Sequence, residues 1–215
     1  ALTKVTAITY DGNNNPLTRT DALGKITQFT YDANGNLTRT TDALGNMVNI
    51  TYDASGLPLT VTDARGNVAT NTYDAQGNLI QVAAPLGNTT TYTYDGAGRR
   101  LTKTDALSHT TTYSYDNNDN LRTATDALNG VMRYTYDGNN NRLAETDRRG
   151  YTTNYTYDRK DLLTVAKDPF GKAVTNTYDA LDRKTAVVDK KGKLTKFAYD
   201  ETGNLRYLTD ALGNV

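Results

Sequence analysis

Carboxylates are the residues of this 215-residue sequence whose number and spacing first suggest chemistry. Two suitably placed Asp or Glu side chains can act as acid and base in hydrolysis. The aspartates here recur in two columns, one directly after a tyrosine and the other ten residues further on. A catalytic pair is unique within a protein, whereas these aspartates are periodic. The pattern therefore favours a structural role, and we expect no catalytic residues and a protein that is not an enzyme.

Two segments, residues 11–15 and 116–120, place oxygen ligands at alternate positions, as calcium loops do. Both lack the Gly and the distal Glu of an EF-hand loop, and both fall where a turn would use Asn and Asp in any case. His109 is the only histidine, and there is no cysteine. A zinc site or a Ser-His-Asp arrangement would therefore depend on one imidazole ring. We expect no metal site and no bound cofactor.

The elements that carry these residues repeat with a period of 21 residues, without insertion or deletion. The period is marked by a Tyr-Asp pair whose tyrosines we take as structural repeat positions: Tyr10, Tyr31, Tyr52, Tyr73, Tyr94, Tyr115, Tyr136, Tyr157, Tyr178 and Tyr199. Such a fixed period predicts a single repeat array over residues 1–215 in place of ordinary globular domains. Both ends fall in mid-repeat, so we expect a fragment of a longer protein.

Each repeat is punctuated by two clusters of Gly, Asn and Asp, separated by short segments rich in Thr, Tyr, Val and Leu. These segments suit strands, and they are too short and too β-branched for helices. Each period therefore predicts one β-hairpin with two specified turns. Gly, Asn or Asp stands four residues after every tyrosine, and Gly stands fourteen residues after most, with Ser108 and Asn129 as exceptions. We expect a left-handed backbone at the first column and turn closure at the second.

The second aspartate column has one gap, at Ala84. In both columns, an Asp that opens a turn can accept hydrogen bonds from backbone N–H groups two residues on. Residues at alternate positions before each tyrosine, such as Tyr92 and Tyr94, should point to one face of the sheet. Stacked hairpins should then form ladders of aromatic and β-branched side chains, because one hairpin alone buries too little surface to be stable.

A finer pattern alternates between successive repeats. The Leu that opens the second strand stands seven residues after the tyrosine in odd repeats, as Leu17, Leu59, Leu101 and Leu143, and six residues after it in most even repeats. This spacing predicts a turn one residue longer, and a strand one residue shorter, in alternate repeats. The structural unit would then be 42 residues long, and the two kinds of repeat would differ in which side chains face inward.

The segments 31–46 and 199–214 show the pattern Tyr-Asp-x-x-Gly-Asn-Leu nearly whole. This pattern resembles the YD repeat of RHS (rearrangement hot spot) proteins, which include bacterial polymorphic toxins, the B and C components of toxin complexes, wall-associated proteins and teneurins. The resemblance covers the whole chain. It implies an all-β fold in which tandem hairpins form a long antiparallel strip that curves into a spiral shell. In the toxins, such a shell encloses a C-terminal toxic domain.

The same resemblance draws attention to Asp168-Pro169-Phe170-Gly171, because RHS toxins carry an Asp-Pro-x-Gly motif near their self-cleavage site. Here the tetrapeptide occupies the ordinary turn column, in phase, and another repeat follows it. We therefore interpret it as a turn in which proline presets the backbone. A self-cleavage site, if the protein has one, would lie outside these 215 residues.

Composition excludes several classes of partner. Lys and Arg together number 24, as do Asp and Glu, and the pI is about 6.8, so nothing indicates binding to nucleic acid. The mean hydropathy is −0.67, and no apolar run approaches the ~18 residues of a membrane span. Zero cysteines exclude a disulfide framework.

Three hypotheses of function follow. The first is a non-enzymatic structural segment of an RHS/YD-repeat shell that encloses or scaffolds a toxin or effector domain. The second is a cell-surface adhesion or glycan-binding protein that exposes tyrosines such as Tyr92, Tyr113, Tyr134 and Tyr155. The third is a self-assembling filament joined through strand edges. Expected partners are flanking repeats, an enclosed toxin domain or further copies of the chain, and the family implies a secreted or cell-surface location.

Overall fold

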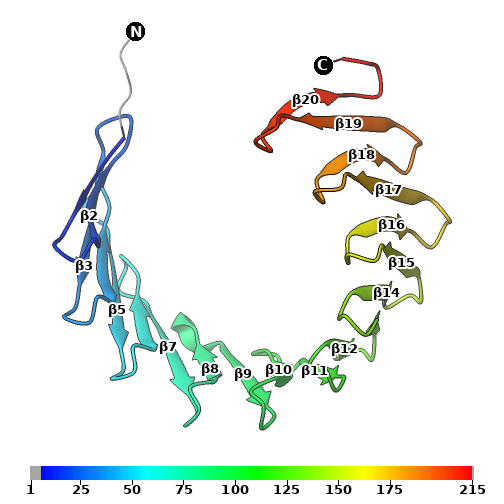
Figure 1. The fold of residues 1–215 in the computed structure, drawn as a ribbon. Helices are drawn as coiled ribbons and strands as arrows, with labels where there is room; N and C mark the ends of the chain where they lie inside the picture. Colours follow the sequence, from blue (N-terminus) through cyan, green and yellow to red (C-terminus); the bar gives the residue numbers. More distant parts are fainter. Residues whose placement is uncertain (1–5, 215) are drawn as a thin grey trace. The chain divides into compact units, whose positions relative to one another are not determined.

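The computed structural model describes residues 6–214, and these form an all-β protein of antiparallel hairpins (Figure 1). The chain divides into an N-terminal unit that ends at Thr110 and a C-terminal unit that begins at Thr111. The N-terminal unit contains β1 (Ala7–Tyr10), β2 (Pro16–Thr20), β3 (Ile26–Tyr31), β4 (Leu37–Thr41), β5 (Met47–Tyr52), β6 (Pro58–Thr62), β7 (Val68–Tyr73), β8 (Leu79–Ala83), a 3₁₀ turn η1 (Pro85–Gly87), β9 (Thr89–Tyr94) and β10 (Arg100–Thr104). The C-terminal unit contains β11 (Thr110–Tyr115), whose first residue belongs to the preceding unit, β12 (Leu121–Thr125), β13 (Val131–Tyr136), β14 (Arg142–Thr146), β15 (Thr152–Tyr157), β16 (Leu163–Lys167), β17 (Ala173–Tyr178), β18 (Lys184–Val188), β19 (Leu194–Tyr199) and β20 (Leu205–Thr209).

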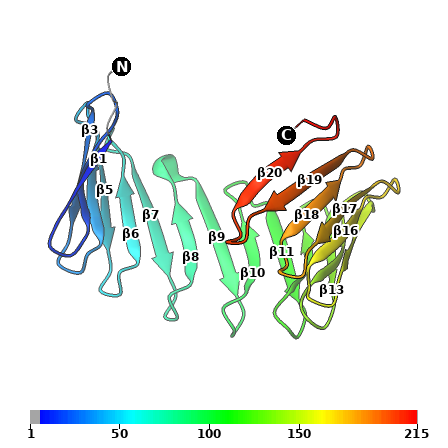
Figure 2. The same cartoon turned by 45° about the horizontal axis from the view of Figure 1, so that its top comes forward.

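Within each unit, every strand pairs with the strands that precede and follow it in the sequence. From β1 to β10 these pairings are all antiparallel, and the same holds from β11 to β20. Figure 2 shows strands such as β5 to β8 side by side in chain order. The predicted all-β fold of tandem hairpins is confirmed.

The hairpins have the same backbone in every repeat. Each tyrosine ends one strand, five turn residues follow, and the next strand begins six residues after the tyrosine. The register shifts at every tyrosine in the same way: in β15 and β16, Thr156 pairs with Val165 and Tyr157 with Leu163, so that Thr164 is an extra residue. This is a β-bulge, and its recurrence keeps all the hairpins in one register.

The prediction of alternating turn lengths is wrong. In even repeats the Leu is the first strand residue and lies opposite the tyrosine, as Leu163 does with Tyr157. In odd repeats the Leu is the bulge residue, and Pro, Arg or Lys takes the place opposite the tyrosine. Leu17 and Leu101 are accordingly 39% and 38% exposed. The sequence alternates over 42 residues, but the backbone does not, because the bulge position accepts Leu and Thr alike.

The two faces of each unit differ in chemistry. In β15, Thr153, Tyr155 and Tyr157 are half-buried on one face, whereas Asn154 and Thr156 are exposed on the other. The same alternation occurs in β9, β11 and β13. We call the side that carries the repeat tyrosines the tyrosine face and the opposite side the threonine face.

No hydrophobic side chain among the described residues is fully buried. Among the described residues, Asn176 is the one that is buried, with an exposed fraction of 8%. Most folds cover the apolar side of a sheet with a second layer. Here each unit is a single layer, and its tyrosine face is covered only by the packing of neighbouring side chains along the ladder.

Candidate functional site

Seven of the repeat tyrosines join their hairpin to the one before it. The hydroxyl of Tyr178 donates a hydrogen bond of 2.9 Å to the carbonyl of Leu163, fifteen residues earlier. Partial burial raises the pKa of this tyrosine above its ordinary value, so the hydroxyl remains a donor. The same bond to the residue fifteen positions earlier, 2.8–3.1 Å long, is made by Tyr52, Tyr73, Tyr94, Tyr136, Tyr157 and Tyr199.

The aspartates of both columns hold the turns by one scheme. Asp42 accepts N–H bonds at Oδ1 from Leu44 (2.8 Å) and Asn46 (2.9 Å), and its Oδ2 accepts the Asn46 side-chain amide at 2.7 Å. These bonds, with that of the Asn46 side chain the largest, hold the pKa of Asp42 below its ordinary value. The expected bond from the residue two positions on is confirmed, and the bond from four positions on is an addition.

Both predicted columns of special backbone are confirmed. All ten residues four positions after a tyrosine have positive φ, from 61° at Asp161 to 90° at Gly203. All ten residues that close the second turn also have positive φ, including the two that are not glycine, Ser108 (63°) and Asn129 (62°). Gly has no steric cost in this region, and Asn and Asp tolerate it better than other residues. The columns are thus selected by backbone geometry.

The turn without an aspartate has a different conformation. In residues 84–88, Leu86 adopts φ 77° and ψ 10°, and it is 98% exposed. Together with Pro85 before it, this is the geometry of a type II turn. The turn at Asp168 also has proline at its second position, yet Phe170 there has no positive φ and donates its N–H to Asp168 Oδ1 at 3.0 Å. The carboxylate, and not the proline, distinguishes the two turns.

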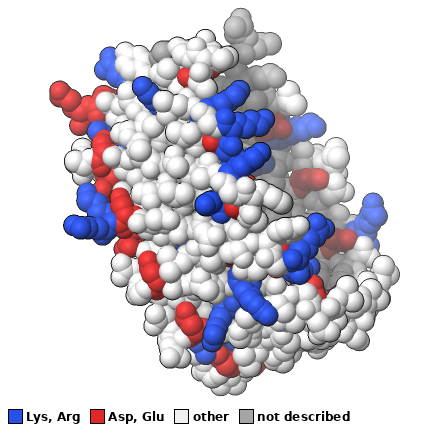
Figure 3. Space-filling model, turned by 90° about the vertical axis from the view of Figure 1, so that its right-hand side faces the viewer, with Lys and Arg blue, Asp and Glu red and all other residues white. Residues whose placement is uncertain are grey.

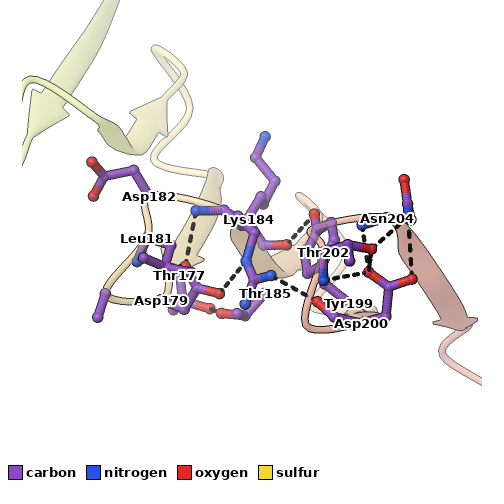
Figure 4. A network of polar contacts seen from close by, with 12 residues as sticks. Thr177, Asp179, Leu181, Asp182, Lys184, Thr185, Tyr199, Asp200, Thr202 and Asn204 are labelled. Atoms are coloured by element: carbon purple, nitrogen blue, oxygen red, sulfur yellow. Dashed lines mark hydrogen bonds and ion pairs between the residues drawn. The ribbon is translucent and has the colours of Figure 1, made fainter.

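Side chains of successive turns also contact one another. In the C-terminal unit, Lys160 pairs with Asp182 at 2.7 Å, and Arg148 pairs with Asp126 at 3.1 Å. Figure 3 shows acidic side chains at regular intervals in a column, with mostly uncharged surface beside it. In the close-up of Figure 4, Tyr199 donates to the Lys184 carbonyl at 2.9 Å. In the C-terminal unit, successive repeats are therefore connected both on the tyrosine face and through their turns.

Arginines lie against the tyrosine face. The Arg142 guanidinium lies 5.9 Å from the centre of the Tyr134 ring and 5.0 Å from that of Tyr155. Arg183 lies 4.9 Å from the centre of the Tyr199 ring. Such cation–π contacts favour a partly desolvated guanidinium. Tyr134 and Tyr155 are half-buried, as are Tyr92 and Tyr113, the other rings considered for glycan binding.

The other sequence candidates are turn residues in the structure. Asp11 and Asp116 each accept backbone N–H bonds within their own turns, so the carboxylates of the two calcium-like segments are occupied by the chain itself. His109 is 60% exposed and contacts Asp105 at 3.1 Å. Residues 6–214 contain no group of three His, Cys, Asp or Glu side chains arranged to hold a metal ion. The Asp168 turn has the ordinary bonds to Phe170 and Lys172.

Sequence reasoning missed one feature, a cavity of about 450 Å³ in the C-terminal unit. Tyr151 and Phe170 line it, with their ring centres 5.6 Å apart. The sequence does mark this place, because no other repeat has Phe or Tyr at either of these turn positions.

This geometry defines a class of protein: a single-layer antiparallel strip of hairpin repeats, linked through tyrosine hydroxyls and aspartate-capped turns. The RHS Repeat family model matches residues 10–47, 52–88, 73–110, 115–152, 136–173 and 178–215. The chain belongs to the RHS repeat family, and the resemblance inferred from the sequence is confirmed. It is a structural repeat segment. A search of curated proteins finds no relative.

A solved structure shows the same fold. The TcdB2–TccC3 complex without its hypervariable C-terminal region matches over 95% of this chain, with a TM-score of 0.51 and 15% identity. The Photorhabdus luminescens Tc holotoxin pore matches over 95% with a TM-score of 0.48 and 16% identity. The present chain spans about 15% of the length of each of those chains. Among the described residues, no helix has the length and apolar character needed to cross a membrane.

Proposed function

We propose that this chain is a non-enzymatic wall segment of a larger RHS shell that encloses a toxin or effector domain. The observation that carries the proposal is the uncovered tyrosine face. Its half-buried aromatic and apolar side chains are stabilised when a further layer removes them from water, and residues 6–214 supply no second layer. A shell covers such a face without a second layer, because the wall curves around an enclosed domain and the face lies against that domain.

The similarity to the TcdB2–TccC3 fold supports this proposal. In the larger protein, the two units would belong to one continuous array whose flanking repeats continue the strip at both ends. The strip would curve into a spiral. As the RHS family suggests, the protein would act at the cell surface or outside the cell.

Limited proteolysis of the intact protein tests the enclosure. An enclosed domain should survive a protease concentration that digests the same domain when it is expressed alone. After the shell is opened with mild denaturant, the domain should become sensitive. Equal digestion rates in the intact and isolated forms would contradict the proposal, and long filaments in electron micrographs would favour self-assembly.

A further inference from the structure

The cavity beside Tyr151 and Phe170 interrupts the uniformity of the repeats. It lies where the turn after β14 meets the turn after β16, and it has a volume of about 450 Å³, within the usual range for small-molecule sites. The two rings are inclined at 42° to each other. They are 47% and 76% exposed, so their faces are available to a ligand.

Hydrogen-bonding groups lie next to the rings. Asp147 Oδ1 accepts the N–H groups of Arg149 (2.8 Å) and Tyr151 (2.9 Å), which fixes the carboxylate and leaves Oδ2 open. The Arg149 guanidinium has no ion pair within the part of the chain that the structure describes. Thr153 adds a hydroxyl to the lining. The cavity thus offers an aromatic surface, a fixed acceptor and a multiple donor.

The remaining charges of the lining are already paired. Lys190 contacts Asp168 at 3.1 Å, and Asp168 is 13% exposed. Although burial opposes its ionisation, the bond from Lys190 and the turn N–H groups hold its pKa below the ordinary value. Arg142 contacts Glu145 at 3.0 Å. Within residues 6–214, the lining then keeps one acidic and one basic group without an ion pair, Asp147 and Arg149, so an ionic ligand gains little net attraction.

We propose that this cavity binds a neutral saccharide. The apolar C–H face of a pyranose ring stacks on Tyr151 and Phe170, because aromatic rings provide large rigid contact surfaces. Neighbouring hydroxyls donate to Asp147 Oδ2 and accept from Arg149, which suits groups that are both donors and acceptors. Thr153 and Tyr155 of the lining belong to the tyrosine face, so in the proposed shell the cavity would open toward the interior. The binding test uses the 215-residue chain alone, so either proposal can fail without the other.

The test measures binding of neutral trisaccharides (maltotriose, cellotriose and chitotriose) to the 215-residue chain by ligand-observed NMR and calorimetry, with trigalacturonate as an acidic probe. Two variants use residues that occur at the same positions in other repeats, so that folding is preserved: Phe170→Leu and Tyr151→Asn. Each should weaken binding by about tenfold. Tyr207→Thr is the matched control, since it removes an equally exposed ring (52%) on the threonine face and should change nothing.

The expected result is that at least one neutral probe binds, more tightly than trigalacturonate, and that both cavity variants weaken it while the control does not. Three results would overturn the proposal: no binding of any neutral probe, equal binding by Phe170→Leu and the unaltered chain, or preferential binding of trigalacturonate. Circular dichroism of each variant verifies that the strands are retained.

Discussion

Replacing Ala84 by Asp tests whether the aspartate determines the conformation of each turn. The turn at residues 84–88 has the backbone hydrogen bonds of its counterparts, Ala84 N–H to Asn88 at 2.7 Å and Gly87 N–H to Ala84 at 3.1 Å. It differs in that Leu86 has a φ of 77°. A carboxylate at position 84 would accept the N–H groups of Leu86 and Asn88, as Asp168 accepts those of Phe170 and Lys172.

The expected gain in stability follows from the backbone strain at Leu86. A left-handed conformation costs a non-glycine residue about 1–2 kcal/mol, and Ala84→Asp should recover most of this by returning Leu86 to negative φ. For a domain of this size, each kcal/mol corresponds to a rise in the melting temperature of about 2–4 °C. Asp168→Ala in the matched proline turn should shift the melting temperature downward.

Thermal and urea unfolding measure the stability, and the Leu86 ³J(HN–Hα) coupling reports its φ. The reasoning is refuted if Ala84→Asp leaves the melting temperature unchanged or lowers it. It is equally refuted if the stability rises while Leu86 keeps its positive φ, because the gain would then have another source.

Three further predictions concern the repeat positions. Tyr178→Phe should lower the free energy of unfolding in urea by about 0.5–1.5 kcal/mol, because it removes a hydrogen bond from the hydroxyl to the Leu163 carbonyl. Tyr155→Phe should cost less, because the Tyr155 ring lies against Arg142 and stays in place. Gly45→Ala, at φ 84°, should destabilise the fold by about 1 kcal/mol. Gly12→Ala, with open space around its Cβ, should be tolerated. Equal losses of stability in the two variants would refute the role of positive φ at Gly45. Asp42 and its equivalents have lowered folded-state pKa values. Their contribution to the free energy of unfolding is therefore complete above the ordinary value of 3.8 and is lost as pH falls through the folded-state pKa. A urea midpoint that does not decrease from pH 5 to pH 2 would contradict this.

The turn columns were predictable because the backbone restricts them. Positive φ admits few residue types, so Gly35, Asn14 and Asp119 share one column although their side chains differ. The aspartate bonds were predictable for the same reason, since an Asx turn needs an acceptor at its first position. These features depend on local geometry that each repeat contains whole.

The bulge and the cavity depend on relations between segments. The position of Leu17 suggested a longer turn, but the backbone is constant and only the identity of the bulge residue changes. The contact between Tyr151 and Phe170 joins residues of two turns nineteen positions apart. It becomes apparent only when the register places successive turns side by side.

If the chain is a shell wall, its tyrosine face is covered in the intact protein. The chain has no cysteine, so single thiols can be introduced at neighbouring residues of β7 that point to opposite faces: Ala69→Cys on the tyrosine face and Thr70→Cys on the threonine face. Maleimide labelling rates are then compared between the isolated chain and the intact protein. Both thiols should react in the isolated chain, and Ala69→Cys alone should become protected in the intact protein. Equal rates for Ala69→Cys in both forms would contradict it.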